Sequence, residues 1–427
     1  MEGYFIRWGQ QDLEVRFPRK WQIQTLVAPP FQPGKKESEQ VEDALDRPIG
    51  THRLEELVRP GDRVAILVND ITRLWERPSF FLPFILNRLE LAGVKDEDIL
   101  ILIATGGHRT NTPDELARIV GTDVYGRIKV VNHDCHDRSS LVKVRRNRRG
   151  QPYLLNRLAV KADRVIATGG ITFHSLAGFS GGPKSVLPGV AGYDTIQQNH
   201  RLAIDDTCRI RPEITKGRVT GNPVAEDMAT AARALGVDFM LNVIVGGDGR
   251  YLGVVAGDVL EAHARGCEFA RSCFQAALEQ PAPLVVASVG GFPRDLEMYQ
   301  SIKSLDNAAT VCEDRGTVVL ASYCSDGVGS RGWLEWFNAG DRDAVMGRLL
   351  KGFTIEGFIA LKTIELTTRY RVIFLSSLDK KLVRRFNMES VDSLDEALAL
   401  ADQDLPPDCR VVFMPWAGTT VPVLSAK

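Results

Sequence analysis

Short, nearly continuous apolar runs rich in β-branched residues recur along the chain, and such runs predict strands that are buried on both faces. Segments with helical spacing separate them, for example Phe80 to Leu91 and Leu296 to Ala309, the latter behind a candidate cap at Asp295. Strands that alternate with helices predict an α/β fold with mostly parallel sheets. The predicted strands cover residues 63–68, 99–103, 164–167, 239–245, 284–287, 317–320, 371–375 and 410–414.

The length of the chain, 427 residues, favours two domains over a single compact core. Residues 261–280 have a helical composition, and Pro281-Ala-Pro283 follows them as the expected crossing between domains. We therefore expect an N-terminal α/β domain in residues 1–272 and a C-terminal α/β domain in residues 273–427. The active site is expected in the cleft between the two domains.

Composition and charge exclude several classes of protein. The 53 Lys and Arg residues against 54 Asp and Glu leave a net charge of -1, so no overall field attracts nucleic acid or anionic membranes. No apolar run reaches the ~20 residues that span a bilayer and no signal peptide is visible, so we expect a cytoplasmic protein. The seven scattered cysteines lack a CxxC pair and are interpreted as small buried residues. The one basic run, Lys143 to Arg149, is interpreted as an exposed hairpin tip and not as an RNA contact.

Glycine pairs end three of the predicted strands, at Gly106-Gly107, Gly169-Gly170 and Gly290-Gly291. A glycine pair lets the backbone turn sharply and approach a ligand closely. In open α/β sheets, ligands bind at the carboxyl ends of the strands. The three pairs are therefore expected to agree on one edge of a sheet, which marks a candidate ligand-binding edge.

Three histidines lie in or beside the segments that follow this edge: His108, His174 and His200. Imidazole gains or loses a proton near neutral pH and is also the commonest metal ligand, so catalysis or metal binding is favoured over a structural role. His133 and His136 follow a predicted strand at a spacing that fits no metal site, and we interpret them as structural.

A Gly- and Pro-rich loop between His174 and His200 contains a single lysine, Lys184. A lysine in such a restrained loop can hold a phosphate or, once desolvated, act as a nucleophile that bonds to a cofactor, and both interpretations stay open. Asp70 and Arg73 follow the first strand and offer a hydrogen-bond acceptor and a planar fork for a carboxylate or phosphate. In the second domain, Tyr299 and Lys303 lie one helical turn apart and suit an anionic ligand.

These residues carry a resemblance that covers most of the chain in order. The chain resembles the nickel-dependent lactate racemase family. The motifs are Asn69-Asp-Ile-Thr-Arg73, Ala104-Thr-Gly-Gly-His-Arg109, His174, Gly178-Phe-Ser-Gly-Gly-Pro-Lys184, Leu187-Pro-Gly189, Asn199-His200, Gly221-Asn-Pro223, Ala262-His263 and Tyr299-Gln-Ser-Ile-Lys303.

The resemblance implies a nickel pincer nucleotide, a pyridinium mononucleotide with two sulfur donors, attached through a thioamide to Lys184. It implies that His200 is the protein ligand of the nickel and that His108 and His174 are the paired acid and base. One histidine would remove the hydroxyl proton while the Cα hydride passes to the cofactor, which gives a bound 2-keto acid before the hydride returns to the other face. Implied cofactor contacts are Asp70, Arg73, Thr105, Gly106, Gly107, Gly169, Gly170, Ser180, Gly181 and Gly182; implied substrate contacts are Arg73, Tyr299, Gln300 and Lys303.

The implied function is racemisation or epimerisation of a 2-hydroxy acid, either lactate or a larger one. Implied partners are that small molecule and the proteins that synthesise the cofactor, with no nucleic acid and no membrane. A zinc-dependent hydrolase with the three histidines on the metal is the alternative enzyme, but it lacks a carboxylate ligand and leaves Lys184 without a role. A non-catalytic binding protein for hydroxy acids is the other alternative, and it would not need two titrating histidines.

Overall fold

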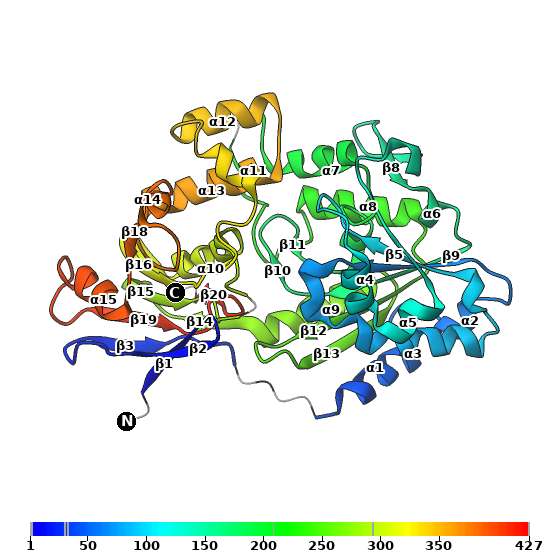
Figure 1. Ribbon diagram of the computed structural model, residues 1–427, viewed down its shortest axis with the longest axis horizontal. Coiled ribbons are helices and arrows are strands. Elements are labelled where there is room, and N and C mark those ends of the chain that lie inside the picture. Colours follow the sequence, from blue (N-terminus) through cyan, green and yellow to red (C-terminus); the bar gives the residue numbers. More distant parts are fainter. Residues whose placement is uncertain (1–2, 30, 32–33, 208, 293, 426–427) are drawn as a thin grey trace. The chain divides into compact units, whose positions relative to one another are not determined.

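The computed structural model describes residues 3–29, 31, 34–207, 209–292 and 294–425, and its contacts divide the chain into two units (Figure 1). The continuous unit comprises residues 31–271, and the split unit comprises residues 1–30 together with 272–427. Each has its own mostly parallel six-stranded sheet with helices around it, which confirms the predicted α/β class.

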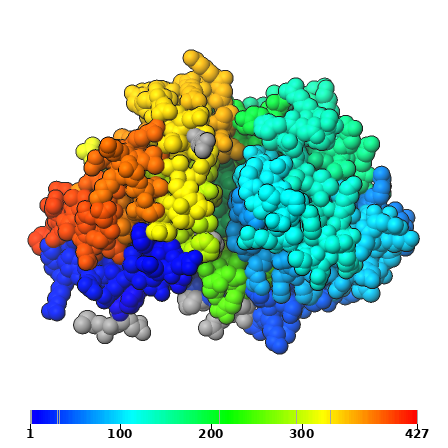
Figure 2. All heavy atoms as spheres, in the orientation of Figure 1, coloured from blue at the N-terminus to red at the C-terminus, as the bar shows by residue number. Residues whose placement is uncertain are grey.

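The first thirty residues group with the C-terminal part of the chain and not with the N-terminal domain to which the sequence analysis assigned them. The reason is strand pairing, because β3 (Gln22–Thr25) runs parallel to β19 (Arg410–Met414) and extends that sheet at its edge. In Figure 2 the dark blue start of the chain lies against the red and orange C-terminal segment. The chain passes between units inside the helix α9 (Glu261–Phe274), before the expected crossing at Pro281-Ala-Pro283, where a strand already begins at Ala282.

The sheet of the continuous unit has the order β13-β12-β9-β4-β5-β6, and only the edge strand β13 is antiparallel. The apolar runs recognised in the sequence form its central strands, where every residue from Val64 to Val68 is buried. The strands are β4 (Val64–Asn69), β5 (Ile99–Ala104), β6 (Lys129–Asn132), β9 (Arg164–Gly170), β12 (Phe239–Val245) and β13 (Tyr251–Gly257).

Helices cover both faces of this sheet. The apolar sides of α1, α3 and α4 pack in one core with the strands, whereas α8 lies across the opposite face (Figure 1). Helices of this unit are α1 (Glu37–Asp46), α2 (Leu54–Leu57), α3 (Pro78–Leu91), α4 (Pro113–Val120), α5 (Thr122–Arg127), α6 (Arg157–Val160), α7 (Tyr193–His200), α8 (Pro223–Leu235) and α9, with 3-10 turns η1 (Ile71–Glu76), η2 (Asp96–Asp98), η3 (Arg138–Ser140), η4 (Gly182–Ser185) and η5 (Arg201–Ala203).

The strand order reverses between β4 and β9. From β4 the chain moves outward through β5 to β6, then returns to β9 on the other side of β4 and continues outward to β12. At such a reversal the connections leave in opposite directions and open a crevice at the carboxyl ends of the two strands. The segments that follow β4, β5 and β9 therefore meet around one place.

Two hairpins stand outside the sheet. The antiparallel pair β7 (Leu141–Arg146) and β8 (Pro152–Asn156) carries the basic run at its turn, which confirms the expected exposed hairpin. The second pair, β10 (Phe173–His174) and β11 (Gly178–Phe179), is short and leads from β9 into the loop that carries Lys184.

The sheet of the split unit is entirely parallel, with the order β18-β17-β16-β15-β19-β3. Its central strands again coincide with predicted apolar runs, and they pack against α15 in a second core. The further elements are β1 (Tyr4–Trp8), β2 (Gln11–Val15), β14 (Gln275–Leu278), β15 (Ala282–Ser288), α10 (Met298–Thr310), β16 (Cys312–Ala321), α11 (Arg331–Trp336), α12 (Arg342–Lys351), α13 (Ile355–Arg369), β17 (Arg371–Leu375), α14 (Lys380–Arg384), β18 (Glu389–Val391), α15 (Leu394–Asp402) and β20 (Val421–Leu424).

The predicted cap at Asp295 is wrong. The helix α10 begins at Met298, and its cap position is Glu297, whose side chain makes no capping hydrogen bond. Asp295 is buried and its Oδ2 instead accepts hydrogen bonds from the backbone N–H groups of Gly9 at 2.7 Å and Tyr323 at 3.2 Å. The carboxylate thus ties the N-terminal residues to the sheet of the split unit.

None of the helices in the described part of the chain combines the length and apolar composition that crossing a bilayer requires.

Asn222, at the start of α8, makes four hydrogen bonds although it is completely buried. Its Oδ1 accepts from the N–H groups of Val224 and Ala225, and its Nδ2 donates to the carbonyls of Leu176 and Arg218. We expect Asn222→Ala to lower the free energy of unfolding by about 2–4 kcal/mol, because it removes a helix cap and leaves the buried carbonyl of Leu176 and the partly buried carbonyl of Arg218 without this donor. Urea unfolding measures this loss.

Thr112→Ala is the matched control, because the exposed Thr112 caps α4 through one side-chain bond. We expect it to cost only about 1 kcal/mol. Equal losses in the two variants would contradict the role given to the two carbonyls.

Candidate active site

The site lies where β4, β5 and β9 end, at the reversal of the strand order. Asp70 follows β4, His108 follows β5, and the Gly169-Gly170 pair ends β9. The third glycine pair, Gly290-Gly291, follows β15 in the other sheet, so the expectation that all three pairs share one edge is wrong. The sequence signals at residues 70, 108 and 170 therefore belong to one edge of one sheet, as expected.

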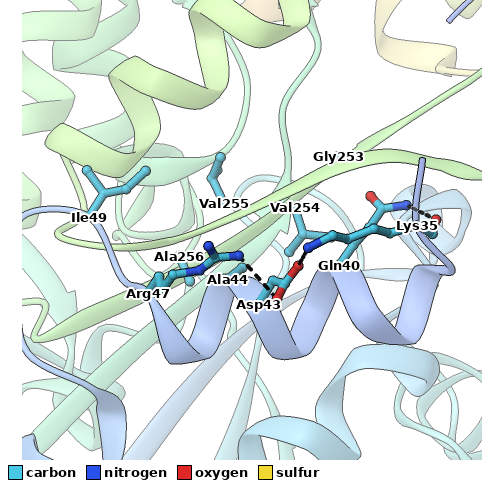
Figure 3. A pocket seen from close by; sticks show the side chains of 10 residues that line it. All are labelled: Lys35, Gln40, Asp43, Ala44, Arg47, Ile49, Gly253, Val254, Val255 and Ala256. Atoms are coloured by element: carbon cyan, nitrogen blue, oxygen red, sulfur yellow. Dashed lines mark hydrogen bonds and ion pairs between the residues drawn. The ribbon is translucent and has the colours of Figure 1, made fainter. Parts of the chain in front are cut away.

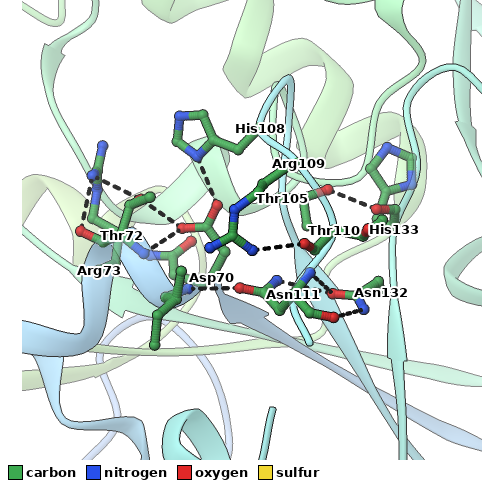
Figure 4. Close-up of polar contacts among 12 residues, drawn as sticks. Asp70, Thr72, Arg73, Thr105, His108, Arg109, Thr110, Asn111, Asn132 and His133 are labelled. Atoms are coloured by element: carbon green, nitrogen blue, oxygen red, sulfur yellow. Dashed lines mark hydrogen bonds and ion pairs between the residues drawn. The ribbon is translucent and has the colours of Figure 1, made fainter. Parts of the chain in front are cut away.

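Asp70 and His108 form a tight pair (Figure 4). The Nδ1 of His108 lies 2.6 Å from Oδ2 of Asp70, while Oδ1 of Asp70 accepts from the N–H and hydroxyl of Thr72. Burial of Asp70 acts to raise its pKa, but the hydrogen bonds from His108 and Thr72 outweigh it and lower the pKa below its ordinary value. The ionised carboxylate accepts the proton of Nδ1, so Nε2 of His108 has its lone pair free.

Arg73 lies in the turn after Asp70, where its guanidinium donates to the backbone carbonyl and the hydroxyl of Thr72. Its positive charge lowers the pKa values of Asp70, Glu76 and Lys184. Arg73 therefore contributes a cation beside a buried carboxylate, and its binding of an anion stays a prediction.

Arg109, next to His108, does not supply a second free cation, because it is already paired. Its guanidinium makes a two-pronged ion pair with Glu115, at 2.6 and 2.8 Å, and donates to the carbonyl of Thr110. Figure 4 shows that Asn111 and Asn132 pin the backbone of the same loop from below. The loop that carries His108 is thus fixed on both sides.

The loop of residues 178–189, called the lysine loop below, is anchored on the end of β9. The hydroxyl of Ser180 donates to the carbonyl of Gly170 at 2.7 Å, and the hydroxyl of Ser185 donates to that of Thr168 at 2.9 Å. Gly189 accepts at its carbonyl from the N–H of Gly106 after β5. The loop is therefore bonded to the ends of β9 and β5, the two strands that flank β4, and Lys184 lies between its anchors.

Lys184 is partly buried, and its Nζ lies 3.5 Å from Nε2 of His174. Burial, followed by the charge of Arg73, lowers the pKa of Lys184 to about 7. An amine with such a pKa has a substantial unprotonated fraction at neutral pH and is available as a nucleophile, which an ordinary lysine is not.

His174 has its ring oriented by the backbone. Its Nδ1 accepts from the N–H groups of Leu176 and Ala177, both at 3.2 Å. In the neutral ring the proton is therefore on Nε2, the atom that faces Lys184. His174 thus presents a donor where His108 presents an acceptor.

His200 ends the helix α7 and is buried. Its Nδ1 donates to the carbonyl of Ile196, one helical turn earlier, at 2.8 Å. Burial, followed by the charge of Lys184, lowers the pKa of His200 to about 4, so the ring is neutral. The lone pair on Nε2 is then available to a metal, and the helix holds the ring in one orientation.

The remaining predicted cofactor contacts have structural partners of their own. The hydroxyl of Thr105 donates to the carbonyl of His133, and Gly106 adopts a left-handed conformation with φ of 57°. A Cβ on Gly170 would lie 2.8 Å from the ring of Trp75 and 2.9 Å from Cγ of Glu76, so close packing requires a glycine there. Only Gly107 faces open space, since a Cβ there would meet no atom within 4 Å. Contact between these residues and a cofactor stays a prediction.

Tyr299, Gln300 and Lys303 lie on α10 of the split unit. The Nζ of Lys303 donates to Oε1 of Gln300 at 2.8 Å, and the ring of Tyr299 meets that of Trp333 edge-on at 5.6 Å. Their shared helical face is confirmed. Their contact with substrate and the interdomain cleft stay predictions.

Three buried polar residues at the site escaped the sequence analysis as functional candidates: Glu76, Asn242 and His263. His263 belongs to the Ala262-His263 motif, to which no role was given, and Glu76 lies three residues after Arg73. Asn69 donates its amide to both carboxyl oxygens of Glu76, at 3.0 and 2.9 Å, and burial raises the pKa of Glu76 to about 7. Asn242 lies in a predicted strand and His263 in a helical segment, and neither pattern indicates a contact with a distant residue. Asn242 binds Gly182 and His263 binds Ser180.

The described residues contain no group of three or more His, Cys, Asp and Glu side chains that is arranged to hold a metal ion. The expectation of the alternative zinc hydrolase, that three histidines converge on one metal, is therefore not met by His108, His174 and His200. His200 alone among them presents a buried lone pair.

A cavity of about 320 Å³ between α1 and β13 lies apart from this site (Figure 3). Its charged groups already pair with one another, because Asp43 forms ion pairs with both Lys35 and Arg47. None of the predicted site residues lines it, so we do not assign a function to this cavity.

Comparison with known proteins gives consistent matches over nearly the whole chain. The family model "Lactate racemase N-terminal domain" matches residues 8–210, and "Lactate racemase C-terminal domain" matches residues 277–423. A lactate racemase of Lactiplantibacillus plantarum is 34% identical over 377 residues, which are 86% of either chain. A lactate racemase of Thermoanaerobacterium thermosaccharolyticum is 31% identical over 425 residues, 97% of this chain and 98% of that one.

Solved structures agree with these matches. The lactate racemase apoprotein of Thermoanaerobacterium thermosaccharolyticum superposes with a TM-score of 0.89 at 29% identity, covering 99% of this chain and 100% of that one. A protein of Thermotoga maritima shares the fold with a TM-score of 0.68 at 18% identity, covering 93% and 100%.

The buried carboxyl of Glu76 predicts a pH dependence of stability. It titrates near 4.5 when unfolded and near 7 when folded, so the folded protein binds this proton more tightly. The resulting stabilisation is complete below about pH 4.5 and is lost as the pH rises to about 7. Because Glu76→Gln stays neutral, we expect the unfolding free energy of the wild type to fall relative to the variant by about 3 kcal/mol across this range.

Urea unfolding of both proteins at pH 4.5 and pH 7.5 measures this difference. Any constant offset between the proteins, such as a changed bond to Asn69, cancels in the comparison. A difference that does not vary with pH would contradict a buried, proton-binding Glu76.

Proposed function

Because the chain belongs to the lactate racemase family, we propose that it is an isomerase that racemises lactate or epimerises a larger 2-hydroxy acid. The observation that carries the proposal is the position of Lys184, a partly buried amine with a pKa of about 7 beside His174. Its charge also acts on the buried ring of His200. A binding protein for hydroxy acids has no need of such a nucleophile.

The residues fit a tethered nickel pincer nucleotide. Lys184 has the unprotonated amine that covalent attachment requires, and imidazole is a suitable ligand for Ni(II). Lys184 would hold the nucleotide, and Nε2 of His200 would hold the nickel. When bound, this group supplies an acceptor for the Cα hydride of the substrate.

His108 acts as a base toward the hydroxyl group of the substrate. Its Nδ1–H donates a hydrogen bond to Asp70, which leaves Nε2 as the proton acceptor. The carboxylate also places a negative charge beside the imidazolium that forms when Nε2 takes up a proton. The hydrogen bond to the buried carboxylate also fixes the orientation of the ring.

His174 begins in the complementary state. Because two backbone N–H groups bind its Nδ1, Nε2 carries the single proton of the neutral ring and offers it as a hydrogen bond to the opposite side of the substrate. The ring returns a proton to the substrate from its doubly protonated form, since a neutral ring that lost this proton would become an imidazolate anion. One histidine that accepts and one that donates are what a racemase needs in one direction. After the transfer the two roles are exchanged, which allows the reverse direction.

Arg73 supplies the positive charge for the substrate carboxylate or a cofactor phosphate. Tyr299, Gln300 and Lys303 are proposed as further substrate contacts. The small-molecule substrate and the proteins that synthesise the cofactor are the proposed partners.

We expect Lys184→Ala to abolish a covalent adduct of several hundred daltons in protein produced together with the cofactor-synthesis proteins. The reason is that this amine combines burial, a lowered pKa and an anchored loop. Intact-mass spectrometry detects the adduct, and nickel analysis follows it. The exposed Lys161→Ala is the control and should retain the adduct; an adduct that survives in Lys184→Ala would overturn the assignment.

His108→Ala and His174→Ala should each slow racemisation of both lactate enantiomers by about 10²–10⁴-fold, because the proton must leave on one face and return on the other. Polarimetry from either pure enantiomer, with larger 2-hydroxy acids in parallel, measures the rates. His52→Ala changes an exposed histidine and should leave both rates unaltered. Near-normal rates in either site variant would exclude the two-histidine scheme.

A further inference from the structure

The lysine loop is gripped by two buried side chains from outside it that have no role in the proposed chemistry. One is His263 on α9, part of the Ala262-His263 motif, and the other is Asn242 on β12. They bind the two peptide groups that flank Gly181, within four residues of Lys184.

His263 binds the first of these peptide groups. Its Nε2 donates to the carbonyl of Ser180 at 2.9 Å, and only 6% of the residue is exposed. Its ring also lies flush against the loop, because a Cβ on Gly182 would be 2.6 Å from Cγ of His263. Burial lowers the pKa of His263, so the ring is neutral, as a single donated hydrogen bond requires.

Asn242 binds the second peptide group. Its Oδ1 accepts from the N–H of Gly182 at 2.7 Å, and its Nδ2 donates to the carbonyl of Leu241 at 2.8 Å, which fixes the orientation of the amide. The residue is completely buried. A Cβ on Gly181 would lie 2.5 Å from Oδ1, so the strand and the loop are in direct contact.

Glycine makes this grip necessary. Gly181 and Gly182 have φ values of 77° and 49°, a left-handed conformation in which glycine has no intrinsic preference over its alternatives. The carbonyl of Gly181 accepts from the N–H of Lys184 at 3.1 Å, so the orientation of this peptide sets the start of the turn on which the lysine lies. Rotation at Gly181 would move Lys184 relative to His174.

We propose that His263 and Asn242 are positioning residues that hold the Gly181 peptide and thereby aim the amine of Lys184. The inference rests on the proposed function only in taking Lys184 as the attachment point. The hydroxyl anchors of Ser180 and Ser185 fix where the loop lies, and the His263–Asn242 pair fixes the conformation of the glycines between them.

Hydrogen exchange in the protein without cofactor tests the grip directly. We expect His263→Ala and Asn242→Ala to speed exchange of the Gly182 and Lys184 amides by about tenfold or more, with other strands of the sheet unaffected. His263→Gln places an amide N–H near the position of Nε2 and should restore slow exchange. Asn156→Ala is the matched control, because Asn156 is similarly buried but hydrogen-bonds to His133 and Leu158.

Adduct formation provides the second readout. After identical production with the cofactor-synthesis proteins, the fraction of molecules with an adduct on Lys184 should fall severalfold in His263→Ala and Asn242→Ala and be retained in His263→Gln and Asn156→Ala. If His263→Ala does not fold, the proposal is tested by the exchange rates and adduct fractions of Asn242→Ala and of His263→Gln, each compared with the wild type.

Unchanged exchange in the lysine loop of Asn242→Ala, equal acceleration in Asn156→Ala, or failure of His263→Gln to restore slow exchange would each overturn the proposal. Faster exchange with undiminished adduct would also overturn it, because the loop would then not aim the lysine. Absence of any adduct in the wild type would instead refute the proposed function. Hydrogen exchange alone would then test whether His263 and Asn242 hold the Gly181 peptide.

Discussion

The bond between the lysine loop and the end of β9 is the constraint on which the site depends. After β9 the chain forms the short β10–β11 hairpin. The hydroxyls of Ser180 and Ser185 then bind the carbonyls of Gly170 and Thr168 at the end of β9. His174 lies in the hairpin and Lys184 lies in the loop that follows it, so both residues are close to the end of β9. The parallel sheet supplies the edge, and these bonds turn it into a site.

Lys184 and Asp70 at this edge respond differently to burial. Burial, followed by the charge of Arg73, lowers the pKa of Lys184, whereas the hydrogen bonds that His108 and Thr72 donate hold the pKa of Asp70 below its ordinary value. The two proposed catalytic rings differ in what binds Nδ1, a carboxylate in one and backbone N–H groups in the other. Backbone and side-chain partners thus favour opposite tautomers of the neutral ring in chemically identical residues.

The sequence predicted those features whose signal is local. Apolar runs identified the central strands, and glycine pairs located the strand ends beside His108 and Lys184. The partners of Asn242 and His263 lie 60 and 83 residues away, so no spacing along the chain reveals them. Asp295 looked like a cap because it precedes a helix, but its acceptor oxygen binds Gly9, 286 residues away. Contacts of this kind depend on packing between elements, which a single sequence does not display.

The pairing of β3 with β19 has a consequence for synthesis on the ribosome. Residues 22–25 emerge early but have no neighbour in their sheet until residues 410–414 follow, nearly 400 residues later. The continuous unit has all its strands by residue 257 and can fold while the chain is still growing. The N-terminal strand must therefore wait unpaired, with its hydrogen-bonding edge open to other chains, for longer than any other strand in the molecule.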